Sequence, residues 1–384
     1  MSILNFIGFG SGYQTGASRQ GECGNAAGTF SIQSIIKRSG TYALQINPVT
    51  TAVGYVDIDA YAAAGEGAAY NEATIYIRFY YYVATLPAAN SEEIFSAYTA
   101  AGAYKFALRI NSTGHLMAFA SDGTTQLGSD GATALSLITW YRIEVSIGTG
   151  ASGAYEVRID GTTELSGTGN LTATNNGYVK LGKFTNRNSQ TVIFYYDDIL
   201  ISNSAFPGAG QSLIMVLDGD GTYTAWTVGA GGAPDWSNVE EVPTDTATTY
   251  LQSTNVVGDA STATLVSTGT AGISGTIVAV KPFFVYARAA LSGSVKIRLR
   301  SGSDNDSSAF GPGGSGWRVA AAIHEVNPIT AVAWTLSDLD ALEVGMVENH
   351  TTRKTNCSSI YAMVEFIAAA PPSGNPWYAY SQMQ

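Results

Sequence analysis

The feature that most constrains the fold is an alternation of apolar and polar residues along short segments. Between residues 75 and 83, isoleucine, phenylalanine, tyrosine and valine occupy every second position. The same alternation recurs at 141–147, 155–159 and 295–300. Because successive side chains of an extended strand point to opposite faces, each segment predicts a strand with one packed face and one face toward solvent or a neighbour.

Strand-like segments continue along most of the chain, separated by spacers rich in Gly, Ser, Thr, Asn and Asp. The 43 glycines suit tight turns, where they supply positive φ angles. We therefore predict an all-β fold of two β-sandwich or jelly-roll domains in tandem. A single helix is expected at 335–343, capped by Thr335 or Ser337 and ended by Gly345. Further strands are predicted at 41–47, 54–59, 104–110, 116–120, 178–184, 191–202, 213–217, 223–228, 262–267, 276–289, 317–325 and 360–367.

The chain has 384 residues, which is long for a single hydrophobic core. Pro207, Gly208 and Gly210 cluster where the strand pattern pauses, so we place a boundary there and predict domains at 1–207 and 208–370. Residues 371–384 are predicted to form an extended aromatic tail, which contacts either a neighbouring subunit or its own domain.

The charge balance excludes one class of partner. The net charge is −11 and no run of basic residues occurs, so binding to nucleic acid is not expected. No apolar run approaches the roughly 20 residues that span a bilayer, and no export signal is recognisable at the start. We expect neutral partners such as glycans or protein subunits.

The sequence gives little support for catalysis. A glucanase strand would carry carboxylates at alternate positions, but residues 156–160 place Arg158 where the middle acid belongs. His115, His324 and His350 are far apart in the sequence, with no zinc-ligand spacing and no Gly-x-Ser-x-Gly motif nearby. We therefore expect that the protein is not an enzyme.

The sequence contains candidate residues for two kinds of binding site. Asp197 and Asp198 lie on the last predicted strand of the first domain and are candidate ligands of a structural calcium, the only cofactor expected. The alternative is that their carboxylates accept backbone hydrogen bonds in turns or caps. Tyr80, Tyr82 and Tyr104 are candidates for stacking on sugar rings, and the alternative is ordinary packing on a sheet.

The first half resembles the concanavalin A-like lectin/glucanase superfamily, and within it the laminin-G-like jelly rolls. This resemblance covers about residues 1–207 and implies a lectin-type jelly roll. Its motifs lie at 38–46, 140–145, 155–161 and 195–201.

The second half resembles a β-sandwich module that recurs in tailed-phage structural proteins. The resemblance covers about residues 211–370. Its motifs lie at 218–226, 239–245, 275–280, 325–328 and 333–343.

Together the two resemblances imply a surface-exposed virion protein of a tailed bacteriophage, either a tail fibre or spike subunit or a capsid decoration subunit. Such a protein would assemble in the host cytoplasm, leave by lysis, contact other virion proteins as a homo-oligomer and touch host surface polysaccharide. The alternatives are a carbohydrate-binding adhesin module and a polysaccharide depolymerase. Which domain anchors and which faces outward stays open.

Overall fold

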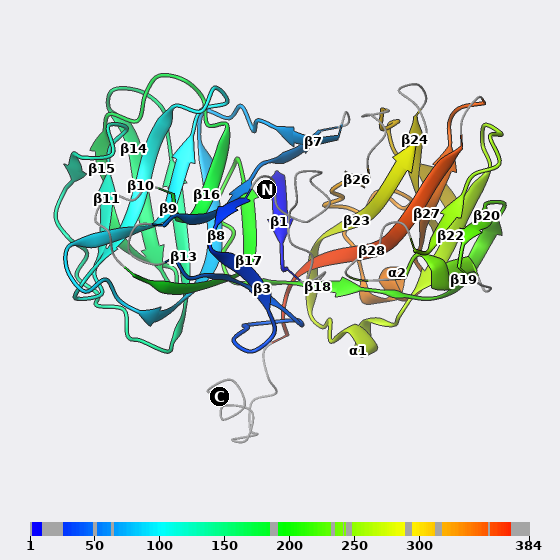
Figure 1. Cartoon of the computed structure of the whole chain (residues 1–384), viewed down its shortest axis with the longest axis horizontal. Coiled ribbons are helices and arrows are strands. Elements are labelled where there is room, and N and C mark those ends of the chain that lie inside the picture. Colours follow the sequence, from blue (N-terminus) through cyan, green and yellow to red (C-terminus); the bar gives the residue numbers. More distant parts are fainter. Residues whose placement is uncertain are drawn as a thin grey trace.

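A computed structural model describes most of the chain. The described residues are 2–9, 26–48, 52–62, 65–184, 191–231, 235–240, 242, 248–288, 294–311, 317–351 and 354–369, so the tail predicted at 371–384 lies outside them. Antiparallel sheets make up nearly all of the structure and form two β-sandwiches side by side (Figure 1). The prediction of an all-β fold is confirmed. No helix in the described ranges is both long and apolar enough to cross a bilayer.

The first sandwich stacks two sheets. The β8 sheet has the order β15-β14-β13-β8-β17-β4-β3, with β1 added against β17, and the β9 sheet has the order β12-β11-β10-β9-β16-β5-β2. A short hairpin pairs β6 with β7. The strands are β1 (Ile3–Ile7), β2 (Ala26–Gly28), β3 (Phe30–Gln33), β4 (Ala43–Ile46), β5 (Gly54–Ile58), β6 (Ala60–Ala62), β7 (Gly65–Ala68), β8 (Ile75–Thr85), β9 (Ser91–Tyr98), β10 (Tyr104–Asn111), β11 (Leu116–Phe119), β12 (Gln126–Leu127), β13 (Trp140–Ile147), β14 (Gly153–Ile159), β15 (Thr162–Gly169), β16 (Tyr178–Lys183) and β17 (Ile193–Ser202).

The second sandwich also stacks two sheets. The β23 sheet has the order β20-β21-β28-β23-β26, with β18 added against β28, and the β22 sheet has the order β19-β22-β27-β24-β25. Its elements are β18 (Gln211–Met215), β19 (Leu217–Thr224), β20 (Thr227–Ala230), the 3₁₀-helix η1 (Asp235–Asn238), β21 (Tyr250–Gln252), β22 (Ala260–Leu265), α1 (Thr268–Ala271), β23 (Thr276–Arg288), β24 (Val295–Ser301), β25 (Ser303–Asp306), β26 (Arg318–Ala321), α2 (Leu336–Asp340), β27 (Glu343–Glu348) and β28 (Thr355–Ile367).

The alternation in the sequence decides which side chains fill the first core. In β8 the residues Ile75, Ile77 and Phe79 are fully buried between the two sheets, together with Tyr81 and Val83. Equivalent positions on β9, β10, β13 and β16 meet them from both sheets. At roughly 25 cal/mol per Å² of apolar surface buried, such a core is the main stabilising contribution to the sandwich.

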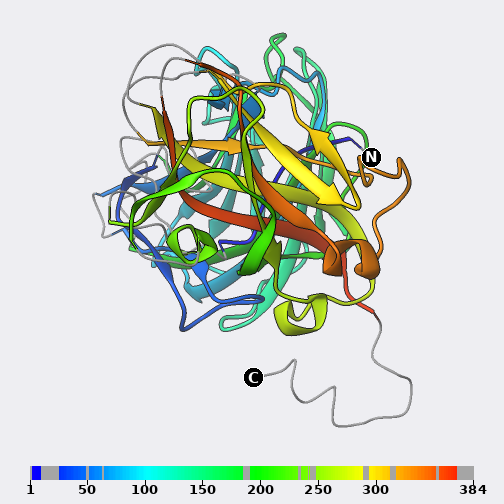
Figure 2. The ribbon, with the colours of Figure 1, turned by 90° about the vertical axis from the view of Figure 1, so that its right-hand side faces the viewer.

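The predicted helix exists, but it is shorter than expected. Thr335 caps α2 through a capping box, in which Thr335 Oγ1 accepts from the backbone N–H of Asp338 and the Asp338 carboxylate accepts from the N–H of Thr335. The helix ends at Asp340, before the expected stop at Gly345, because β27 begins at Glu343. A second short helix, α1, lies at the same end of the sandwich, and the Asp340 carboxylate accepts from the N–H of Thr268 at 2.7 Å (Figure 2).

A third apolar cluster joins the two sandwiches. Its members come from β1, β17 and the outer face of the β23 sheet, so β23 and β28 are covered on both faces. This shared cluster was not expected from the sequence. Separate folding of residues 1–207 and 208–370 stays a prediction. The buried members are Ile3, Phe6, Leu200, Ala279, Phe283, Val285, Val319, Ala321, Tyr361 and Met363.

Charged groups are also buried at this junction. Arg78 of β8 pairs with Glu365 of β28 through two hydrogen bonds of 2.7 and 3.0 Å, and each side chain is only 1% exposed. Ser212 Oγ donates to the same carboxylate at 2.6 Å. Lys281 donates to the Asn5 side chain at 3.2 Å and to the carbonyl oxygen of Phe6. These contacts connect β28 to β8 and β23 to β1.

Candidate functional site

The two broad faces of the first sandwich differ in what covers them. The outer face of the β8 sheet carries the connection to the second sandwich: Arg158 lies 3.8 Å from the ring of Phe206, and Glu144 accepts from the N–H of Gly208 at 2.7 Å. The Arg78 pair with Glu365 lies on the same face. The outer face of the β9 sheet is the other broad face, and it is the candidate site.

We call this surface the tyrosine face, because four tyrosines lie on it. On β5 and β16 alternation explains the arrangement, since Val56 and Leu181 point into the core. On β9 and β10, two register shifts place Glu93 and Tyr104 on the outer face. Cross-strand pairing then brings the outward residues into rows. The tyrosine face comprises Tyr55, Asp57, Glu93, Ser96, Tyr98, Tyr104, Arg109, Tyr178, Lys180 and Phe184.

One row of this face is aromatic. Tyr178 pairs with Tyr98 across β16 and β9, and Tyr98 pairs with Tyr104 across β9 and β10. The rings of Tyr98 and Tyr178 are stacked, with centroids 5.1 Å apart, and the ring of Tyr104 meets Tyr98 edge-on at 5.3 Å. Phe184 lies 5.0 Å from Tyr55 and 5.2 Å from Tyr98. Such contacts fix the rings in place before any ligand arrives.

Lys180 occupies the centre of these rings. Its ammonium lies 4.0 Å from the ring centroid of Tyr55 and 4.2 Å from that of Phe184, with Tyr98 and Tyr178 within 5.6 Å. The carboxylate of Asp57 is 3.0 Å away on the neighbouring strand. Burial lowers the pKa of Lys180, and the negative charge of Asp57 opposes this effect. The ammonium is therefore enclosed by these four rings and the carboxylate of Asp57, an arrangement that we call the aromatic cage.

A second charged group lies beside the cage. Tyr104 donates its hydroxyl to Glu93 at 2.8 Å, and Arg109 Nη2 lies 3.6 Å from the same carboxylate oxygen. Arg109 also donates to the carbonyl oxygen of Gly123 at 2.6 Å and stacks 3.8 Å from the ring of Phe119. Burial raises the pKa of Tyr104, and the Glu93 charge raises it further. Tyr104 therefore stays protonated and acts as a donor.

The exposed parts of the face are mostly apolar rings. Tyr55, Tyr178 and Phe184 are partly exposed, whereas Glu93, Lys180 and the ring of Tyr98 are almost fully buried. A ligand would thus meet aromatic surface first and polar atoms at the edges. This is the combination of rings and a few positioned polar groups that small-molecule sites use.

The structure separates the three tyrosines that the sequence suggested as a sugar site. Tyr104 lies on the tyrosine face, but Tyr80 and Tyr82 belong to β8 and face outward from the other sheet. The guanidinium of Arg38 lies 3.4 Å from the ring of Tyr80, and Trp140 packs 5.3 Å from Tyr82. One groove cannot hold all three.

Tyr55, Tyr178 and Lys180 were not predicted as site residues from the sequence. These residues alternate with buried ones on β5 and β16, so their outward direction could be read from the sequence. Their proximity to one another could not be predicted, because β5 and β16 are far apart in the chain and pair only in the folded sheet.

Asp197 and Asp198 lie in a bulge of β17 and are fully buried. Asp197 accepts from the backbone N–H groups of Arg38 and Ser39 at 3.0 and 3.2 Å. Asp198, at φ +48°, contacts the Arg38 guanidinium and accepts from the N–H of Ser212 at 2.7 Å. Burial and the charge of Asp198 raise the pKa of Asp197. Within the described ranges no three His, Cys, Asp or Glu side chains gather as metal ligands, and calcium binding stays a prediction.

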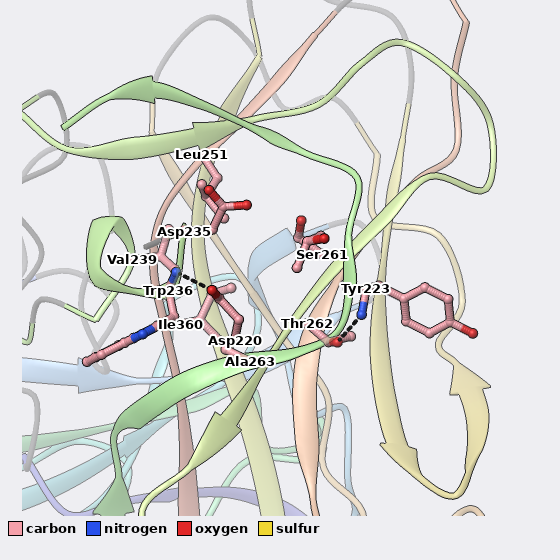
Figure 3. Close-up of a pocket in the computed structure, with 11 residues that line it drawn as sticks. Asp220, Tyr223, Asp235, Trp236, Val239, Leu251, Ser261, Thr262, Ala263 and Ile360 are labelled. Atoms are coloured by element: carbon pink, nitrogen blue, oxygen red, sulfur yellow. Dashed lines mark hydrogen bonds between the residues drawn. The ribbon is translucent and has the colours of Figure 1, made fainter. Parts of the chain in front are cut away.

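The second sandwich has a pocket beside η1 (Figure 3). Asp220 accepts from the N–H of Trp236 at 2.9 Å, and burial together with the charge of Asp220 raises the pKa of Asp235. Its cavity volume is about 10 Å³, which is room for about one water molecule. The tyrosine face is therefore the stronger candidate. The apolar floor consists of Val239, Leu251, Ala263 and Ile360.

Comparison with known proteins gives structural matches alone. No protein-family model matches the sequence. No curated protein matches it either. Among solved structures, the cellulose induced protein Cip1 matches with a TM-score of 0.41 and 14% identity, over 53% of this chain and 99% of that one. A mutant of Trypanosoma rangeli sialidase displaying trans-sialidase activity matches with a TM-score of 0.36 and 12% identity, over 53% and 31%. Trypanosoma rangeli sialidase in complex with sialic acid gives the same four values.

These matches assign no residue a role. The alignment spans less than a third of each of the two sialidase chains, at 31%. The expectation that the protein is not an enzyme is nevertheless overturned, because sialidase chains are among the matches. No match named here is a phage protein, and the phage resemblance stays a prediction.

Proposed function

We propose that this protein binds a polysaccharide on the tyrosine face, as a surface component of a tailed-phage particle. The observation that supports binding is the fixed group of rings around Lys180. Tyr55, Tyr178 and Phe184 each leave part of a ring exposed while their neighbours hold them in position. Exposed rings of fixed orientation lie well against the C–H faces of pyranose rings, and little side-chain entropy is lost on binding.

The position of the face in the molecule also supports this proposal. The second sandwich is hydrogen-bonded to β1, β8 and the β17 bulge, which lie outside the tyrosine face. A long polymer could therefore reach the face while the second sandwich is attached to a particle. We propose that the second sandwich attaches to the particle and that the first sandwich binds the polymer.

The virion setting rests on the sequence resemblance of residues 218–226 and 333–343 to tailed-phage structural modules. It predicts that the protein is present in purified particles of its source, at a stoichiometry that a homo-oligomer explains. Mass spectrometry of purified particles, before and after surface proteolysis, tests it. Absence of the chain from the particles would refute the virion setting and leave the binding proposal standing.

Glycan binding is tested by affinity electrophoresis and calorimetry with a panel of soluble polysaccharides. Tyr178→Ala and Phe184→Ala remove two partly exposed rings, and each should raise Kd about tenfold or more, as expected for a central aromatic contact. The matched control is Tyr223→Ala. Tyr223 is also a partly exposed tyrosine beside charged pairs, with its hydroxyl 2.7 Å from Asp304, but it belongs to the second sandwich.

The control should leave Kd unchanged. An equal loss in all three variants would refute the assignment of binding to the tyrosine face, and so would unchanged binding in both face variants. The same incubations, sampled for new reducing ends, report any turnover of the polysaccharide.

A further inference from the structure

We infer that the ligand of the tyrosine face is a neutral glycan and not an acidic one, an inference that rests on the proposed function above. The reason is the way in which charges on this face are arranged. Two acids and two bases lie on it, and each base is already held by an acid and by aromatic rings. The charged residues are Asp57, Glu93, Arg109 and Lys180.

The ammonium of Lys180 is closed to a ligand carboxylate. The side chain is 7% exposed, Asp57 lies 3.0 Å from the ammonium, and four rings fill the surrounding directions. A sugar carboxylate would have to displace Asp57 or a ring before it could pair with the cation. Displacing one partner of a buried ion pair leaves an uncompensated charge, which is strongly unfavourable.

Arg109 is closed in a similar way. It is 6% exposed, its Nη2 lies near Glu93 and donates to Gly123, and its plane rests on the ring of Phe119. Recognition of a carboxylate by arginine normally uses a free edge with two parallel donors. Both such donor pairs of the guanidinium include Nη2, which already contacts Glu93 and Gly123, so a uronic acid or sialic acid would find no free pair of donors.

One donor on this face is still unused within the described part of the chain. The Nε–H of Arg109 is buried and has no hydrogen-bond partner there. Because this donor is buried and the charge of Arg109 is already balanced by Glu93, it offers a ligand carboxylate neither an accessible hydrogen bond nor a free charge. The net charge of −11 on the chain also repels polyanions at long range.

The test compares neutral with acidic polysaccharides. The neutral panel is mixed-linkage β-glucan, galactomannan and dextran, and the acidic panel is alginate, hyaluronan and polysialic acid. We expect binding within the neutral panel with a Kd that changes less than about twofold between low and high salt, because no net charge is exchanged. Acidic polymers should not bind. Salt-sensitive binding of an acidic polymer to the tyrosine face would overturn the inference, whereas no binding to any polymer would overturn the proposed function itself.

A second variant tests the physical reason directly. Asp57→Asn with Glu93→Gln keeps the shapes of both side chains but leaves Lys180 and Arg109 unbalanced. This double variant should gain affinity for alginate, at least about tenfold at low salt, and lose the gain at high salt. Circular dichroism confirms that it is folded. A folded double variant that still ignores alginate would show that paired acids are not what rejects acidic glycans.

Discussion

The substitution Arg78→Met removes one partner of the ion pair between the two sandwiches. Arg78 and Glu365 are each 1% exposed, so no water replaces the guanidinium when it is lost. Glu365 would keep the hydroxyl of Ser212 at 2.6 Å as a partner, and the carbonyl oxygen of Asp198 would lose its donor, Arg78 Nε, at 3.1 Å. Breaking one side of a buried pair costs about 3–5 kcal/mol, and we expect Arg78→Met to lower the free energy of unfolding by that amount.

The pH dependence of this loss follows from Glu365. Burial raises the pKa of Glu365 in the folded protein, although Arg78 opposes the effect. Without Arg78 this pKa rises further, so the carboxyl group takes up a proton as the pH falls and the uncompensated charge disappears. The destabilisation by Arg78→Met should therefore be largest at neutral pH and smaller at low pH.

The assay is urea denaturation followed by tryptophan fluorescence. It compares the wild type, Arg78→Met, Glu365→Met and the double variant. Since an apolar replacement of a buried pair is often neutral, the double variant should recover most of the stability lost in Arg78→Met. A single variant that loses less than about 1 kcal/mol, or a double variant as unstable as the sum of both singles, would refute this reasoning.

Three further predictions follow from buried groups. Burial lowers the pKa of His324 to about 4, so stability should fall as the pH drops from about 6.5 toward 4, by up to about 3 kcal/mol, and His324→Gln should lack this loss in urea titrations. A Cβ on Gly345 would meet the carbonyl oxygen of Ser261 at 2.0 Å, so Gly345→Ala should cost about 1–3 kcal/mol by the same assay, and an unchanged midpoint would contradict the pairing of β22 with β27. Because Arg38 and backbone groups occupy Asp197 and Asp198, EDTA should leave Tm unchanged; a drop that calcium restores would instead support the calcium hypothesis.

The sequence is most informative where one strand face is packed. In β8 the alternation alone identifies Ile75, Phe79 and Val83 as core residues, and all three are fully buried. It is least informative about Arg78, which lies on the opposite face. There Arg78 meets Glu365 of β28, and the two residues are 287 positions apart in the chain. No local sequence pattern predicts a contact over such a separation.

The same limit applies to the candidate site. The sequence singles out tyrosines, and Tyr104 does lie on the tyrosine face, but Tyr80 and Tyr82 lie on the other sheet. What assembles the face is the pairing of β9 with β10 and with β16, which sets Tyr98 between Tyr104 and Tyr178. Strand order in an antiparallel sandwich depends on long-range connections, so short motifs cannot predict it.

Glycan binding on the tyrosine face is tested most directly by a crystal structure with a bound oligosaccharide, taken from the polysaccharide that binds most tightly. We expect a sugar ring against the exposed parts of Tyr55, Tyr178 and Phe184. A sugar seated in the pocket beside Trp236, with the tyrosine face empty, would contradict it.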